Sequence, residues 1–153
     1  MRFVILRVET FISLTTYSVA ALSNALYSAD MKDKLAVASC ISMALAVGCG
    51  AFGAHALQDT LSEKDLAIWH TAVLYQMVHS LAALIATTFE RDGRKTTRLA
   101  ALFLLSTTVF SGSLYLLVLL NQRWMGAITP LGGTGFIISW LLFARLLMRT
   151  NRL

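Results

Sequence analysis

Charged residues are scarce in this sequence. Only 14% of its 153 residues are Asp, Glu, Lys or Arg, while 57% are hydrophobic, and the mean hydropathy is +0.68. Soluble domains carry about 25% charged and roughly 45–50% apolar residues, so the composition excludes an ordinary soluble domain and a disordered chain. Cysteine is also rare. Cys40 and Cys49 are the only two, they lie in one uncharged run, and they are too few for a disulfide scaffold.

Long uncharged runs make up more than half of the sequence. No Asp, Glu, Lys or Arg occurs in four runs of 21 to 24 residues, which are 35–57, 66–89, 99–120 and 124–144. A helix of roughly 20 residues crosses a hydrocarbon core of about 30 Å, and lipid leaves a backbone no other hydrogen-bond partner than its own helix. The short connections force neighbouring spans to be antiparallel. The sequence therefore predicts an all-α membrane protein, an antiparallel four-helix transmembrane bundle within residues 31–153, with the fourth span reaching about residue 148.

Basic residues are distributed unevenly between the two sides of the predicted bundle. One side holds nine of them: Lys32, Lys34, Arg91, Arg94, Lys95, Arg98, Arg145, Arg149 and Arg152. The other side holds only Lys64 and Arg123. An excess of Lys and Arg marks cytoplasmic loops, so we expect an N-in/C-in topology. Because these charges flank apolar runs, the net charge of +5 indicates a lipid bilayer as partner and no nucleic acid.

Residues 1–30 are a separate N-terminal extension. The run Phe11–Ala29 is uncharged but rich in Ser and Thr, which makes it a marginal membrane span. Three interpretations stay open: translation that begins at Met31, a peripheral or fifth helix, and a cleaved signal peptide with Arg2 and Arg7 as its basic start.

Small residues recur at positions where membrane helices could pack closely. In the first span they are spaced by four, at Ala38, Ser42, Ala46, Gly50 and Ala54. Gly112 in the third span, and Pro130, Gly132 and Gly133 in the fourth, complete the predicted packing set. Such stripes let a second helix approach. The partner is either another helix of this chain or, alternatively, a second copy, or the stripe lines a ligand channel.

A polar group lies within the spans. We predict a candidate intramembrane site from His55, His70, Tyr75, Gln76, His79, Ser111 and Thr129. Ala72, Gln76, His79 and Ala83 form one stripe that should face the bundle. Two interpretations of these residues are open: they form hydrogen bonds between helices, or they form a relay for a proton or a ligand. His79 lies about 13 Å deeper than His70, so we expect no metal and no cofactor, although two axial haem ligands are geometrically allowed.

The start of the fourth span is unusual, because residues 126–135 contain four glycines and the only proline. Two interpretations compete. In one, the helix starts near Pro130 after a short re-entrant stretch. In the other, a longer helix is kinked at Pro130 and packs closely through Gly132 and Gly133.

Four ordered motifs carry a family resemblance. They are Gly50–Leu57 (GAFGAHAL), Trp69 with Tyr75-Gln76 and His79, Phe110–Tyr115 (FSGSLY), and Gly126–Gly133 (GAITPLGG) with Phe136 and Trp140. Over about residues 35–148 the sequence resembles the membrane-protein family DUF423, also called UPF0382. The resemblance implies a protein of three or four spans in the bacterial inner membrane, and it implies no known activity.

These observations favour a non-enzymatic protein that acts by helix association, as a homo-oligomer or with a membrane-protein partner. No acid or histidine in the third span could activate Ser111 or Ser113 as a nucleophile. Two alternatives remain. One is a small transporter or channel component that uses His79, Gln76 and a broken fourth helix. The other is a haem or quinone redox subunit.

Overall fold

The computed structural model describes the backbone of residues 2–89 and 93–148 and the side chains of residues 29–89 and 95–148, and all regular secondary structure in this part is helical. The elements are α1 (Arg2–His55), α2 (Glu63–Thr88), α3 (Gly93–Leu119), the 3₁₀ helix η1 (Arg123–Ala127) and α4 (Thr129–Met148). Four stretches are long and apolar enough to cross a membrane: Ala29–His55, Glu63–Thr88, Lys95–Leu119 and Arg123–Met148. The prediction of an all-α chain with four such helices is confirmed.

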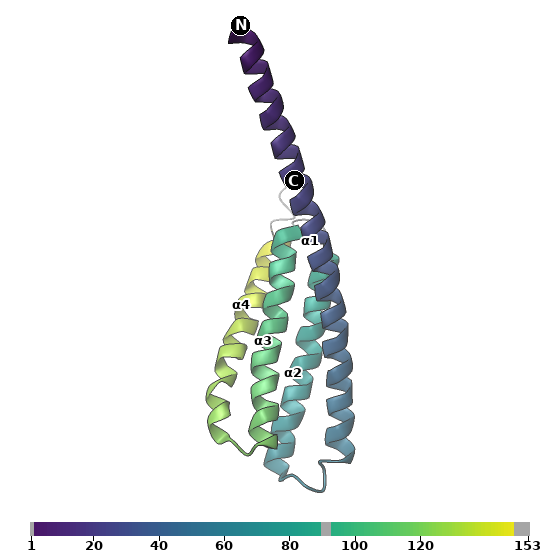
Figure 1. Ribbon diagram of the computed structural model, residues 1–153. Coiled ribbons are helices and arrows are strands. Elements are labelled where there is room, and N and C mark those ends of the chain that lie inside the picture. The colour runs from purple at the N-terminus through teal and green to yellow at the C-terminus, as the bar shows by residue number, and fades with distance from the viewer. Residues whose placement is uncertain (1, 90–92, 149–153) are drawn as a thin grey trace.

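Consecutive helices connect at alternating ends of the bundle, and α3 lies at its centre, in contact with α1, α2 and α4 (Figure 1). α1 packs mainly on α2. Beyond the bundle α1 continues without a break to Arg2, so the extension projects from the end where α2 connects to α3 (Figure 1). The side chains of residues 1–28 lie outside the described part, and the three interpretations of the extension stay open.

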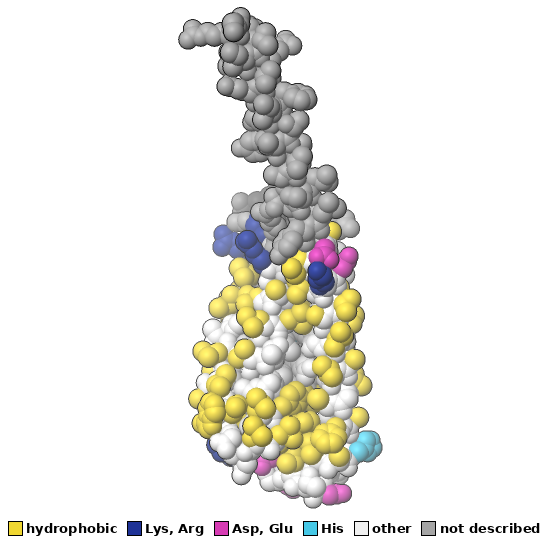
Figure 2. Space-filling model, viewed as in Figure 1, with side chains coloured by type: hydrophobic (Ala, Val, Ile, Leu, Met, Phe, Trp, Pro, Cys, Tyr) yellow, Lys and Arg dark blue, Asp and Glu magenta, His cyan; other side chains and the backbone are white. Residues whose placement is uncertain are grey.

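The face of the bundle shown in Figure 2 is largely uncharged between two ends that carry charged side chains. Large side chains such as Leu105, Leu131 and Leu141 are 62–70% exposed. In water such a surface would cause aggregation, whereas in a bilayer it contacts lipid tails. The charged side chains gather at the ends, where headgroups and water lie.

Helix ends are set by local caps rather than by the last uncharged residue. Ser62 is the N-cap of α2, and its Oγ accepts a hydrogen bond from the Asp65 amide at 3.1 Å. The Asp65 carboxylate in turn forms a bidentate ion pair with Arg123, at 2.7 and 3.3 Å. This pair joins the α1–α2 end of the bundle to η1. α1 ends at His55, two residues before the predicted limit, and Leu57 folds back into the core.

α1 and α2 approach closely where a glycine meets an indole. A Cβ at Gly53 would lie 2.6 Å from two atoms of the Trp69 ring. The Trp69 Nε1 donates a hydrogen bond of 2.8 Å to the carbonyl oxygen of Cys49. The indole is therefore fixed against α1 by both a contact and a hydrogen bond, and only glycine fits beneath it.

α4 is one unbroken helix that begins at Thr129, next to Pro130, so the first of our two interpretations agrees with the structure and the kinked longer helix is wrong. Pro130 is the second residue of α4, where its missing N–H costs no helical hydrogen bond. The stretch before it is the short 3₁₀ helix η1. The close approach to α3 is made by Gly132, where a Cβ would lie 2.6–2.8 Å from the Phe110 backbone and Cβ. The second close contact is at Gly135, against Ser106, rather than at Gly133.

The other predicted packing residues divide into three groups. Ala46 is fully buried, Ser42 hydrogen-bonds to α2, and a Cβ at Gly50 would lie 3.4 Å from Val73. Ala38 is half-buried, whereas Ala54 is exposed. A Cβ at Gly112 would meet no atom within 4 Å. Ala54 and Gly112 therefore differ from our expectation, because the stripe rotates away from α2 along its length and Gly112 faces a groove.

Candidate functional site

Gln76 is the centre of a polar cluster that joins three helices. Its side chain is only 9% exposed. The Nε2 group donates to the Ser42 carbonyl oxygen at 3.0 Å and to Ser42 Oγ at 3.4 Å, and the Tyr115 hydroxyl donates to Oε1 at 2.9 Å. Ser42 Oγ also shares a hydrogen bond of 2.7 Å with Ser80 Oγ. One amide on α2 thus holds α1 and α3 together.

A groove of about 400 Å³ lies beside this cluster, between α1 and α3. Its lining combines apolar residues of α1 with hydroxyl-bearing residues of α3: Ala38, Ile41, Ser42, Leu45, Gln76, Thr107, Thr108, Ser111, Gly112 and Tyr115. Several of these polar groups bond to protein atoms rather than to the groove. Ser111 Oγ donates to the Ala72 carbonyl at 2.8 Å, and Thr107 Oγ1 donates to the Phe103 carbonyl at 2.8 Å. The groove therefore presents mainly an apolar surface to a ligand, with few hydrogen-bonding groups.

His79 lies one turn along α2 from Gln76 and faces α4, within a cluster of aromatic rings. Its ring stacks on Phe136 with centroids 3.4 Å apart, and Tyr75, Phe103 and Trp140 surround it at 5.6–6.2 Å. Its Nδ1 lies 2.8 Å from the Tyr75 carbonyl oxygen. A carbonyl oxygen can only accept, so Nδ1 carries a proton and donates this hydrogen bond. This arrangement packs α2 against α4 through the stacked rings of His79 and Phe136.

The seven predicted site residues do not form one site. Gln76 and Ser111 lie at the groove between α1 and α3, while Tyr75 and His79 face α3 and α4. Thr129 shares a hydrogen bond of 2.8 Å with Ser113 at the start of α4. His55 and His70 are exposed, so the structure does not bring them to His79. The predicted stripe of Ala72, Gln76, His79 and Ala83 is buried, as expected.

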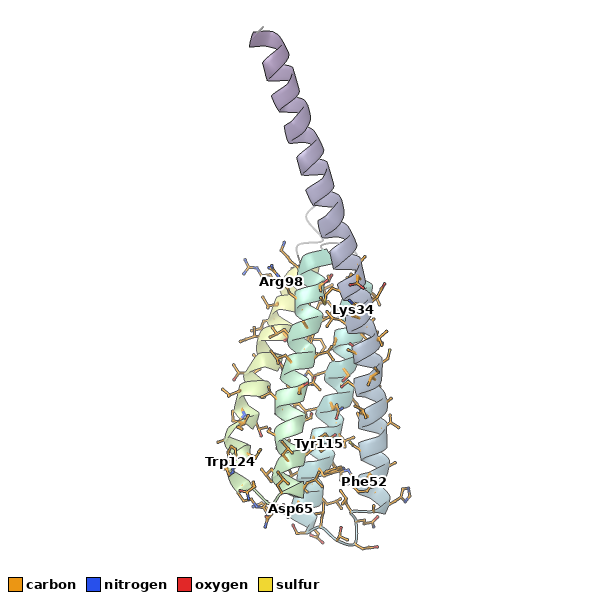
Figure 3. The ribbon with its side chains drawn as sticks, viewed as in Figure 1. Lys34, Phe52, Asp65, Arg98, Tyr115 and Trp124 are labelled. Carbon is orange, nitrogen blue, oxygen red and sulfur yellow. The ribbon has the colours of Figure 1, made fainter. Side chains whose placement is uncertain are left out.

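Sequence reasoning missed the partners of these residues. The pairing of Tyr115 with Gln76 and the stacking of Phe136 on His79 do not follow from the sequence pattern. A polar residue in a membrane helix predicts a hydrogen-bond partner but does not identify it. The partner of Tyr115 is Gln76, which lies 39 residues away in the sequence and on another helix. Figure 3 shows Tyr115 on α3 in the half of the bundle nearer Asp65.

Comparison with known proteins identifies the family. The family model described as "Protein of unknown function (DUF423)" matches residues 49–133. The UPF0382 membrane protein YwdK of Bacillus subtilis is 45% identical over 106 residues, which are 67% of this chain and 85% of the relative. A UPF0382 membrane protein of Staphylococcus epidermidis is 47% identical over 98 residues, 63% of this chain and 80% of the relative. No solved structure matches.

The matched region runs from the end of α1 to the beginning of α4, so it contains Trp69, Gln76, His79 and Tyr115. It also contains the glycines Gly53 and Gly132, each of which lies in close contact with a neighbouring helix. With its four apolar helices and these relatives, the chain is a membrane protein and belongs to the DUF423 (UPF0382) family.

Proposed function

We propose that this protein is a non-enzymatic, multi-pass protein of the bacterial inner membrane that acts by helix–helix association, with a second copy of itself or with another membrane protein. Its four helices cross the bilayer as an antiparallel bundle, and residues 31–153 begin and end in the cytoplasm. The alternating connections (Figure 1) and the nine-to-two distribution of Lys and Arg support this topology.

The topology predicts the outcome of reporter fusions. Alkaline phosphatase fused after Leu153 should be inactive, because that end lies in the cytoplasm, where the enzyme does not form its disulfides. The same enzyme fused after Gln122 should be active. A green fluorescent protein at each position serves as the control and should give the inverse pattern. Activity after Leu153 with none after Gln122 would reverse the proposed orientation.

The observation that carries the association proposal is the exposure of α1. Only 11% of the residues in its most apolar 18-residue stretch are buried. The side facing α2 uses Ser42, Ala46 and Gly53. The opposite side presents a second stripe of exposed small residues with a spacing of four, which are Cys40, Ala44 and Gly48. A Cβ at Gly48 would meet no atom within 4 Å, so this stripe is free to receive another helix.

Hydroxyl groups that could serve catalysis are instead used for structure. Ser111 donates to the Ala72 carbonyl, and Ser113 donates to the Phe110 carbonyl, each at 2.8 Å. Within the described part of the chain, neither hydroxyl forms a hydrogen bond with a histidine or a carboxylate, which supports a role without covalent catalysis.

Cys40 allows a direct test of self-association. In native membranes, thiol oxidation should produce a cross-linked dimer through Cys40, since packed helices lie about 8–10 Å apart. The Cys49→Ser variant should retain the dimer, and the Cys40→Ser variant should lose it. Gly48→Leu should reduce dimer formation by roughly tenfold, because a bulky side chain blocks close approach.

Ala101→Leu is the matched control, because it enlarges an exposed small residue on α3 instead. It should leave the dimer unchanged. If Cys40 forms no cross-link and single-molecule photobleaching counts only monomers in bilayers, self-association through α1 is wrong.

A further inference from the structure

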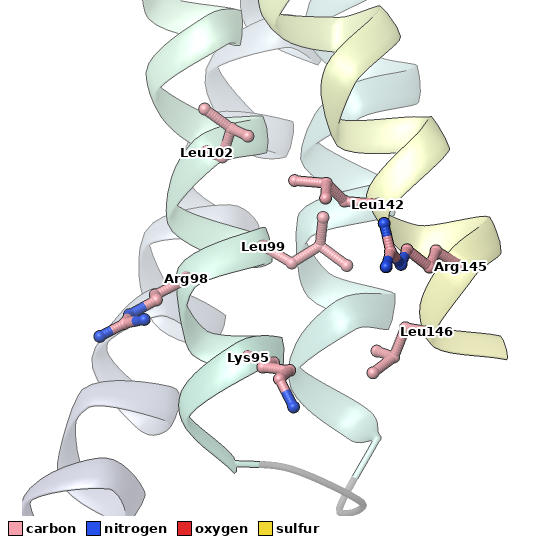
Figure 4. A pocket seen from close by; sticks show the side chains of 7 residues that line it. All are labelled: Lys95, Arg98, Leu99, Leu102, Leu142, Arg145 and Leu146. Carbon is pink, nitrogen blue, oxygen red and sulfur yellow. The ribbon is translucent and has the colours of Figure 1, made fainter. Parts of the chain in front are cut away.

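A second groove lies between α3 and α4, at the end of the bundle where α2 connects to α3 (Figure 4). Its volume is about 490 Å³, which is within the range of roughly 300–1,000 Å³ of small-molecule sites. Three basic residues and four leucines line it: Lys95, Arg98, Leu99, Leu102, Leu142, Arg145 and Leu146. It is separate from the groove beside Gln76.

Charge and apolar surface are segregated along this groove. Lys95 lies about 10 Å along α3 from Leu102, at 1.5 Å per residue. The basic residues therefore lie at the end of the bundle, where lipid headgroups are found, and the leucines lie deeper. Leu99 and Leu142 point toward each other across the gap, and Arg145 extends from α4 toward α3 (Figure 4).

The floor of the groove is part of the packed core. Leu99 is 4% exposed and belongs to a cluster with Ala86, Phe103 and Phe143, against which Leu146 packs. Leu142, by contrast, is 48% exposed. The groove thus has a rigid wall on the protein side and an open side toward the lipid, so an acyl chain could enter from the bilayer.

Two of the three basic residues at the mouth, Arg98 and Arg145, are available to a ligand. Arg98 and Arg145 are exposed, and neither forms an ion pair with any residue that the structure describes. Basic pockets between transmembrane helices favour anionic lipid headgroups. The guanidinium group also matches the geometry of phosphate.

We propose that this groove binds one anionic phospholipid, with its phosphate at Lys95 and Arg145 and an acyl chain between Leu99, Leu102 and Leu142. Arg98, which leaves α3 on the side away from α4 (Figure 4), adds to the positive potential without being the main contact. A zwitterionic lipid with the same chains would contact the leucines equally well but would not neutralise the positive charge of Arg98 and Arg145.

Native mass spectrometry of the full-length protein in detergent tests the proposal. Phosphatidylglycerol should be retained about tenfold better than phosphatidylcholine with the same acyl chains, and soluble glycerol 3-phosphate should not compete. Lys95→Gln/Arg145→Gln should weaken phosphatidylglycerol binding about tenfold or more. Equal retention of the two lipids, or competition by glycerol 3-phosphate alone, overturns the site.

Two further variants separate a site from general surface charge. Lys32→Gln/Lys34→Gln removes the same charge at the same end of the molecule, but from α1, and should change binding less than about twofold. Leu142→Phe fills the groove, keeps every charge and should weaken binding. If the α1 pair weakens binding as much as the groove pair, or if Leu142→Phe has no effect, the lipid does not occupy this groove. If the Lys95→Gln/Arg145→Gln variant fails to fold, Leu142→Phe alone tests whether the lipid occupies this groove.

Discussion

Replacing Gly132 by alanine is expected to lower the free energy of unfolding by about 2–4 kcal/mol, because the added methyl group overpacks a rigid contact. The methyl carbon would lie 2.6 Å from the Phe110 amide nitrogen and 2.8 Å from its Cα. Backbone atoms cannot rotate away, as the end of a flexible side chain can. α3 and α4 would therefore have to separate by about 1 Å to restore van der Waals distance.

Gly133→Ala is the matched control for this prediction. It is the adjacent residue of the same helix turn, but its added methyl group would lie 3.6 Å from the Phe110 ring, an ordinary contact. Its stability should remain within about 0.5 kcal/mol of the parent protein. Unfolding in mixed detergent micelles, followed by tryptophan fluorescence, measures both variants. Equal stability of the two would mean that α3 and α4 do not cross closely at Gly132.

Replacing Gln76 by leucine is expected to lower the free energy of unfolding by about 1–3 kcal/mol, the cost of leaving buried polar groups without partners. The substitution removes the hydrogen bonds to Ser42 and Tyr115 together. Individual hydrogen bonds between membrane helices contribute about 0.6 kcal/mol on average, so the expected loss comes mainly from the unpaired Tyr115 hydroxyl and from the separation of three helices.

A double-mutant cycle identifies the source of this loss. Tyr115→Phe removes the hydroxyl, so in the Gln76→Leu background it should cost nothing and should restore part of the stability. Thr71→Val is the control, because Thr71 is exposed and its hydroxyl donates only to the Ala67 carbonyl of its own helix. Strictly additive effects of the two substitutions would show that Gln76 and Tyr115 are not coupled.

Interhelical packing explains why the small residues of this chain are not equivalent. Gly53 lies beneath the Trp69 indole and Gly132 beneath the Phe110 backbone, whereas Gly48 and Gly112 face open space. All four lie within apolar runs, and their spacing does not distinguish them. What distinguishes them is the rotation of each helix about its own axis. Hydropathy does not predict that rotation in lipid, because every face of the helix is apolar.

The same reasoning separates the polar residues. That Gln76 and His79 face the bundle could be predicted from the stripe with Ala72 and Ala83, since an amide or imidazole avoids hydrocarbon. That Gln76 would bond to Tyr115 on α3, while His79 stacks on Phe136 of α4, depends on how deep each helix sits relative to the next. The basic groove likewise requires Lys95 and Arg145, 50 residues apart in sequence, to meet at one end of the bundle.

The amino-acid sequence by itself determined that this membrane protein has four helices long and apolar enough to cross a bilayer. Uninterrupted runs of 21 to 24 uncharged residues form helices in lipid, because the backbone finds no other hydrogen-bond partner there. Only the tertiary structure decided that α4 starts at Thr129 as an unbroken helix, which polar groups pair, and that two grooves exist. These features depend on distances between separate helices, which close packing at a few glycines sets and which no local pattern encodes.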